Sequence, residues 1–128
     1  MSLTMGVGDN FKSMDVRLAF EPEVFFWVMS PELEKLHEVT GKLVTTYDDA
    51  IFKTQELVHL DSVVRGVENR IQNLPRTWQE HVGTQLKPEK KELYQTVHKH
   101  EFVGFLNKFK AVVTEAKESN MAVLFYGD

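Results

Sequence analysis

The stretch from His100 to Ser119 reads HEFVGFLNKFKAVVTEAKES, and it decides the fold expected for this chain. Its apolar residues recur at spacings of three and four, which places them on one side of a helix, while its charged residues fall elsewhere. Burial of apolar area is worth roughly 25 cal/mol per Å², so other elements must cover a face with three phenylalanines. The apolar stripe consists of Phe102, Phe105, Leu106, Phe109, Val112, Val113 and Ala116.

The length and composition fit one globular domain. The chain has 128 residues, of which 42% are hydrophobic and 27% are charged, and a chain of this length can bury a sizeable single core. No apolar run approaches the roughly 20 residues that span a bilayer, and no secretion signal is visible. We therefore expect a cytoplasmic location. Because the chain has no cysteine, disulfides and thiolate chemistry are excluded.

Charge is unevenly distributed, although the total is only −4. Residues 1–61 carry 11 acids and 5 bases, a net charge of −6, whereas residues 62–128 carry 8 acids and 10 bases, a net charge of +2. The acidic half is either an ordinary solvated surface or a docking face for a basic partner. Nucleic acid is not an expected partner, because phosphate contacts need clustered Lys and Arg.

The first residues lack any periodic pattern. Residues 1–13, MSLTMGVGDNFKS, are small and polar, so we predict a flexible leader followed by a single α+β domain over residues 14–128. Met1 to Leu3 fit a cloning remnant. The glycines at positions 6 and 8 do not form a phosphate loop, since no Lys-Ser/Thr follows them.

Two apolar segments come next. Residues 15–20 alternate partly and residues 23–29, EVFFWVM, are rich in β-formers, which predicts a hairpin whose second strand is central in its sheet. A short helix over the second segment is the alternative, because so brief a run has no decisive period. Ser30 and Pro31 then suit the start of a surface helix, and Gly41 suits its end.

A long helix is predicted over residues 47–74, capped by Thr46 and ended by Pro75. Its apolar pattern changes face midway, at 100° per residue, so a break near residues 59–61 is the alternative. Gly66 inside this helix costs about 1 kcal/mol relative to Ala, and we interpret it as a sign of close packing.

The remaining segments complete the expected fold. Residues 75–88, PRTWQEHVGTQLKP, have no clear period and are predicted to form a long loop, a class that is often functional. Trp78 either packs back on the domain or faces a partner. Strands predicted over residues 92–97 and 121–126 flank the helix predicted over residues 100–119. This order permits a parallel pair of strands with a right-handed crossover. The expected fold class is α+β, with a small mixed sheet of about four strands and two or three helices packed mainly on one face.

Motifs for chemistry are weak. Two Glu-x-x-His pairs, beginning at Glu34 and Glu56, have the spacing of di-iron carboxylate bundles, but the first predicted helix is too short for such a bundle. His98 and His100 could share one side of an extended segment and hold a metal, yet no third ligand lies nearby in the sequence. Neither a nucleophile motif nor a phosphate loop is present. We therefore predict no catalytic residue, no cofactor and no metal.

Several features of the second half occur in a recognisable order. A long helix ends in Gln72-Asn-Leu-Pro75, Trp78 follows three residues later, the strand Leu93-Tyr-Gln-Thr-Val97 comes next, and the amphipathic helix leads into the terminal strand. Over roughly residues 47–126 this arrangement resembles small α+β immunity proteins encoded beside bacterial polymorphic toxins. The resemblance implies a cytoplasmic protein that binds and blocks one partner without catalysis, and it transfers no functional residue. An acidic first half would suit a basic toxin.

These observations predict a small protein-binding domain, of which an immunity protein is one form. One alternative is a small-molecule-binding domain or enzyme with a site near the loop over residues 75–88, which would require a deep pocket. Another is a self-assembling subunit, such as a homodimer, whose terminal strand pairs with its copy. The candidate partner-binding residues are Trp78, Arg76, Asp48, Asp49, His98 and His100.

Overall fold

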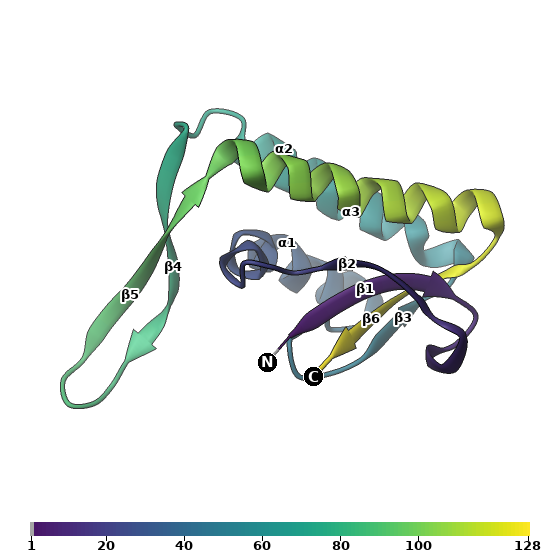
Figure 1. The fold of residues 1–128 in the computed structure, drawn as a ribbon, viewed down its shortest axis with the longest axis horizontal. Coiled ribbons are helices and arrows are strands. Elements are labelled where there is room, and N and C mark those ends of the chain that lie inside the picture. The colour runs from purple at the N-terminus through teal and green to yellow at the C-terminus, as the bar shows by residue number, and fades with distance from the viewer. Residues whose placement is uncertain (1) are drawn as a thin grey trace.

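The computed structural model describes residues 2–128, which form an α+β fold (Figure 1). This confirms the predicted fold class. The strands are β1 (Leu3–Gly8), β2 (Asp15–Ala19), β3 (Ala50–Phe52), β4 (Thr77–Gln85), β5 (Lys91–His98) and β6 (Ala122–Gly127). The helices are α1 (Val24–Thr40), α2 (Leu57–Ile71) and α3 (Lys99–Ser119), with 3-10 turns at Phe11–Ser13 and Thr54–Glu56.

Four strands form one sheet in the order β2-β1-β6-β3, and β4 and β5 form a separate two-stranded sheet. Every strand pairing within residues 2–128 is antiparallel. The parallel pair that the order of strand, helix and strand permits does not occur in this part of the chain. The reason is that α3 carries the chain from one sheet to the other, instead of crossing over a single sheet.

The N-terminal segment forms β1, a central strand, so the prediction of a flexible leader over residues 1–13 is wrong; Met1 lies outside the described residues. Small residues let the neighbouring strand approach, because a Cβ atom on Gly6 would lie 2.3 Å from the carbonyl oxygen of Asp15. Gly6 and Gly8 also weaken the sequence signal for a β-strand, because glycine is depleted in strands. The apolar residues of β1 that alternate into the core are Leu3, Met5 and Val7.

Helix α3 covers one face of the four-stranded sheet (Figure 1), and every residue of its predicted apolar stripe is buried. The ring of Phe109 lies 6.0 Å from that of Phe125 in β6 and 6.3 Å from that of Phe20, which follows β2. Asn120 ends the helix in the left-handed conformation, with φ of 55°, as predicted. The sequence signal for this helix is clear because its burial is confined to one face.

Helix α1 occupies the segment that the hairpin prediction assigned to a second strand, so that prediction is wrong and the alternative helix over residues 23–29 is confirmed in type. The helix continues to Thr40, and Pro31 lies inside it instead of at its start. Pro31 forgoes one backbone hydrogen bond there, which the burial of a helical apolar face outweighs. Gly41 ends the helix with φ of 76°, as predicted. The buried residues of this face include Val24, Phe25, Val28, Met29, Leu33 and Leu36.

The predicted helix over residues 47–74 is wrong in its first part. Thr46 caps no helix, and Asp48 lies in a bend. Asp49 directly precedes β3, and α2 begins only at Leu57. The change of apolar face in the sequence therefore marks the boundary between a strand and a helix. The buried residues of α2 are Leu57, Leu60, Val63, Val64, Val67 and Ile71.

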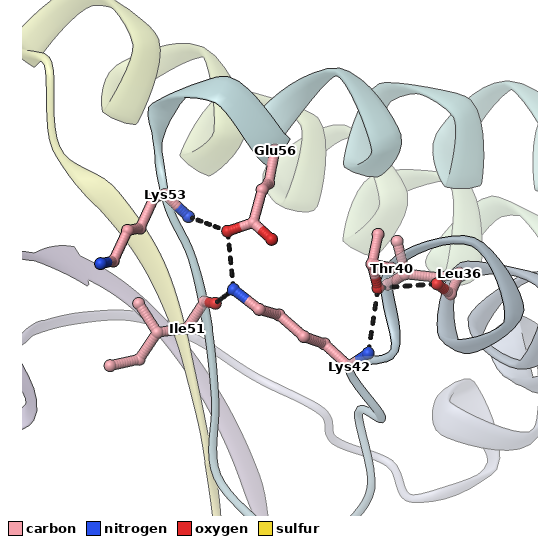
Figure 2. A network of polar contacts seen from close by, with 6 residues as sticks. All are labelled: Leu36, Thr40, Lys42, Ile51, Lys53 and Glu56. Carbon is pink, nitrogen blue, oxygen red and sulfur yellow. Dashed lines mark hydrogen bonds and ion pairs between the residues drawn. The ribbon is translucent and has the colours of Figure 1, made fainter.

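A polar network around Lys42 joins the end of α1 to the start of α2 (Figure 2). Its Nζ donates to the carbonyl oxygen of Ile51 at 2.7 Å and to Oε1 of Glu56 at 2.6 Å. The backbone N–H of Lys53 donates to the same carboxylate oxygen at 3.0 Å. These donors, Lys42 first, hold the pKa of the Glu56 carboxyl below its ordinary value. The network fixes β3 and the first turn of α2 against the linker that follows α1.

Candidate functional site: a projecting ribbon

Strands β4 and β5 form a two-stranded ribbon that projects from the body of the protein (Figure 1). The predicted loop over residues 75–88 is therefore wrong, because most of it is β4. The predicted strand over residues 92–97 is confirmed as part of β5. Pairing runs from Thr77 opposite His98 to Gln85 opposite Lys91, and neither strand joins the four-stranded sheet. The ribbon thus presents an outer edge on each strand.

The two faces of the ribbon differ in their surroundings. Trp78, Glu80 and Val82 are partly buried and point toward the body, whereas the intervening Gln79 and His81 are exposed. A bulge between His81 and Gly83 shifts the alternation by one residue, which increases the local twist. This bulge also hides the strand in the sequence, because a period of two is broken in its middle.

The base of the ribbon is anchored to the helices. The indole ring of Trp78 lies 6.5 Å from the ring of Phe102 in α3, and its Nε1 donates to Glu80 at 3.1 Å. The backbone N–H of Lys99 donates to the carbonyl oxygen of Arg76 at 2.8 Å, and its Nζ donates to two carbonyl oxygens near the end of α2 at 2.8 and 2.9 Å. Trp78 therefore packs back on the domain, and the first turn of α3 sets the direction of the ribbon.

Toward its tip, the outward face carries a connected set of side chains. Glu92 accepts a hydrogen bond from Thr84 at 2.9 Å and is paired with His81. These contacts, Thr84 first, lower the pKa of the exposed Glu92 carboxyl. The ring of His81 lies 5.3 Å from that of Tyr94, whose residue is 57% exposed, and Leu86 in the turn is 73% exposed. The outward face thus offers aromatic and aliphatic area beside hydrogen-bonding groups.

Most of the charges left without a partner on the ribbon are positive, although Glu89 in the turn between β4 and β5 is also exposed and forms no ion pair with another of residues 2–128. Arg76 at the base and Lys87, Lys90 and Lys91 at the tip are exposed, and none forms an ion pair with another of residues 2–128. Glu92 is already paired with His81. Residues 76–98 carry four Lys or Arg and three Glu, a net charge of +1, on a chain whose total charge is −4.

The structure brings together only some of the predicted partner-binding residues. Arg76, His98 and His100 line one hollow at the base of the ribbon. Trp78 lies two positions after Arg76, in β4, where it pairs with Val97 of β5. Asp48 and Asp49 line a different hollow next to Gly41 and Lys42, and Oδ1 of Asp49 accepts the backbone N–H of Gly127 at 3.2 Å. Tyr94, Leu86 and His81 were not predicted from the sequence, because only the pairing of β4 with β5 places them on the ribbon.

The described residues provide no metal centre. Among residues 2–128, no group of three or more His, Asp, Glu or Cys side chains is placed to hold an ion. Of the two Glu-x-x-His pairs, Glu56 is bound to Lys42, while His59 faces a cleft between α1 and α2. Glu34 and His37 lie exposed on α1.

Comparisons of the chain with protein-family models, with curated proteins and with solved structures found no match. Within residues 2–128, the helices are all too short or too polar to cross a membrane. The geometry and charge of the residues themselves carry the functional argument.

Proposed function

We propose that this chain is a protein-binding domain that presents the β4–β5 ribbon to a partner protein. One observation carries the proposal: a two-stranded ribbon projects from the body, with Tyr94 exposed midway along it and Leu86 exposed in its turn. An isolated hairpin is marginally stable in water, and aromatic residues are enriched at protein interfaces. A ribbon of this kind is best stabilised by contacts that it makes in a complex.

The charge of the ribbon supports a partner with an acidic surface. Its unpaired cations, Arg76, Lys87, Lys90 and Lys91, outnumber the unpaired Glu89 and would be complementary to carboxylates around an apolar contact. An inhibitor of the immunity-protein type remains one form of this proposal, with the ribbon as the blocking element. The acidic face that the sequence predicts for a basic toxin is a different surface, because its candidate residues Asp48 and Asp49 line a hollow apart from the ribbon residues.

Site-specific photo-crosslinking in the source cells tests the proposal. A photoreactive phenylalanine analogue replaces Tyr94 or Leu86 in the ribbon, or Val58, an exposed apolar residue of α2 that serves as the control. We expect one discrete adduct from both ribbon positions and none from the control. Adducts from the control position alone, or none from the ribbon when the protein is well expressed, would refute the proposed binding element.

Self-association is the competing explanation for an exposed ribbon, and sedimentation of the purified chain separates the two. We expect a monomer at all concentrations, both for the natural sequence and for Tyr94→Ser. If the chain forms a dimer that Tyr94→Ser dissociates, the ribbon binds a second copy of this chain, and the proposal of a different partner protein is wrong.

A further inference from the structure

A cleft of about 270 Å³ lies between α1 and α2, apart from the ribbon. Its apolar lining comes from Leu36 and Val39 of α1 and Val63 of α2, and its polar lining includes Lys35, His59 and Ser62. Pockets for drug-sized ligands occupy roughly 300 to 1,000 Å³. The cleft therefore has room for a small organic molecule only.

The floor of the cleft includes the buried carboxylate of Glu32, which is paired with the partly exposed Arg70. Both carboxylate oxygens of Glu32 accept hydrogen bonds from Arg70, at 2.6 and 3.1 Å, and Nη2 of Arg70 also donates to the carbonyl oxygen of Val28. Gly66 faces this pair: a Cβ atom there would lie 3.0 Å from Cγ of Glu32. The floor is thus fixed, and its carboxylate is already neutralised by its own cation.

The rim, in contrast, carries groups with no partner in the protein. The side chains of Lys35 and His59 make no hydrogen bond or ion pair with any other of residues 2–128, and both line the cleft. Ser62 adds a hydroxyl that donates its proton to the carbonyl oxygen of Val58 at 3.3 Å and accepts from Nη2 of Arg65 at 3.4 Å, which leaves one lone pair for a ligand. Since Glu32 is paired with Arg70, the charge presented to a ligand is positive.

We propose that this cleft binds a small amphipathic carboxylate, with the acid group at Lys35 and His59 and the apolar part against Leu36, Val39 and Val63. A cation at the rim selects the anionic acid over its neutral amide, because the two differ in charge while they share shape. The apolar lining favours an aromatic or short aliphatic body over a hydrophilic acid. This site is independent of the ribbon and of the proposed partner protein.

The test is a nitrogen-15 NMR titration of the full chain with benzoate, and with benzamide as the neutral isostere. We expect benzoate in the millimolar range to shift the amide signals of residues around Val63 and Gly66, and benzamide to bind at least about tenfold more weakly. So few ligand atoms support only modest affinity. Equal binding of the two compounds, shifts confined to the ribbon, or no shifts at all would each overturn the proposal.

Variants assign the rim groups. Lys35→Met and His59→Gln should each weaken benzoate binding several-fold without changing the binding of benzamide or the thermal midpoint, because both side chains are unbonded within the protein. Lys110→Met is the matched control, since Lys110 is exposed on α3 and lines none of the hollows around α1 and α2. A loss of affinity in the control equal to that in Lys35→Met would show a nonspecific charge effect and would contradict the site.

Discussion

Replacing Arg70 should destabilise the protein more than replacing its partner. In Arg70→Met the carboxylate of Glu32 stays buried without a cation, since only 6% of its side chain is exposed. Removal of one partner of a buried pair costs about 3 to 5 kcal/mol. We expect the lower end, about 3 kcal/mol, because 35% of the Arg70 side chain is exposed and water screens the pair. The thermal midpoint should fall by about 10 °C.

The reverse change, Glu32→Gln, leaves a cation that water can reach and that still donates to the carbonyl oxygen of Val28. Its cost should be about 1 to 2 kcal/mol, in the range of hydrogen bonds to charged groups. The double variant should lose less free energy of unfolding than the two single variants added together, because both substitutions remove the same ion pair between Arg70 and Glu32.

Urea unfolding followed by circular dichroism measures these free energies, with an unchanged slope as the sign that two-state behaviour holds. Equal losses in the two single variants, or a loss under about 1 kcal/mol in Arg70→Met, would refute the idea that desolvation of the carboxylate dominates this pair.

Four further substitutions test other parts of the fold. Lys42→Met should lower the free energy of unfolding by about 1 kcal/mol at pH 7. Because the pKa of the Glu56 carboxyl is lowered in the folded protein, the part of this loss that comes from the ion pair should be present above the ordinary pKa and disappear as the pH falls through the lowered value. The contact of Lys42 with the carbonyl oxygen of Ile51 does not depend on that charge, so the loss should shrink but not disappear in unfolding curves measured over a series of pH values from 7 downward. Gly104→Ala should stabilise the protein by up to about 1 kcal/mol, since a Cβ atom there meets nothing within 4 Å. Gly66→Ala should instead destabilise the protein, because its Cβ atom would lie 3.0 Å from Cγ of Glu32. Equal shifts of the melting temperature in the two variants would contradict this close contact. Phe109→Ala should lose about 3 to 5 kcal/mol through the cavity it leaves, and a calorimetric loss under 1 kcal/mol would mean that the core collapses around it.

Whether an element could be predicted from the sequence depends on how that element is buried. The helix over residues 100–119 was predictable because solvent lies along one side and the core along the other. Residues 23–29 were ambiguous, since a dense apolar run buried on much of its surface carries little periodicity in either conformation. β1 was missed because Gly6, which close strand approach requires, reads as a loop residue in isolation.

The candidate surfaces were less predictable than the fold. Arg76, His98 and His100 were brought to one hollow by the pairing of β4 with β5, although that pairing itself was not foreseen. The cleft between α1 and α2 could not be read from the chain, because Glu32 and Gly66 are separated by 33 intervening positions and meet only through helix packing. His59 was singled out for a motif that does not assemble, and it lies instead on the rim of that cleft.

By itself, the sequence determined the α+β class, the helix α3 and the two strands that flank it, because these depend on local periodicity and on end residues such as Asn120. Only the tertiary structure decided the strand order, the separation of the ribbon from the sheet and the path of α1 through Pro31. The physical reason is that pairing and burial depend on residues far apart in the chain. Their free energy outweighs a local preference of about one kcal/mol per residue.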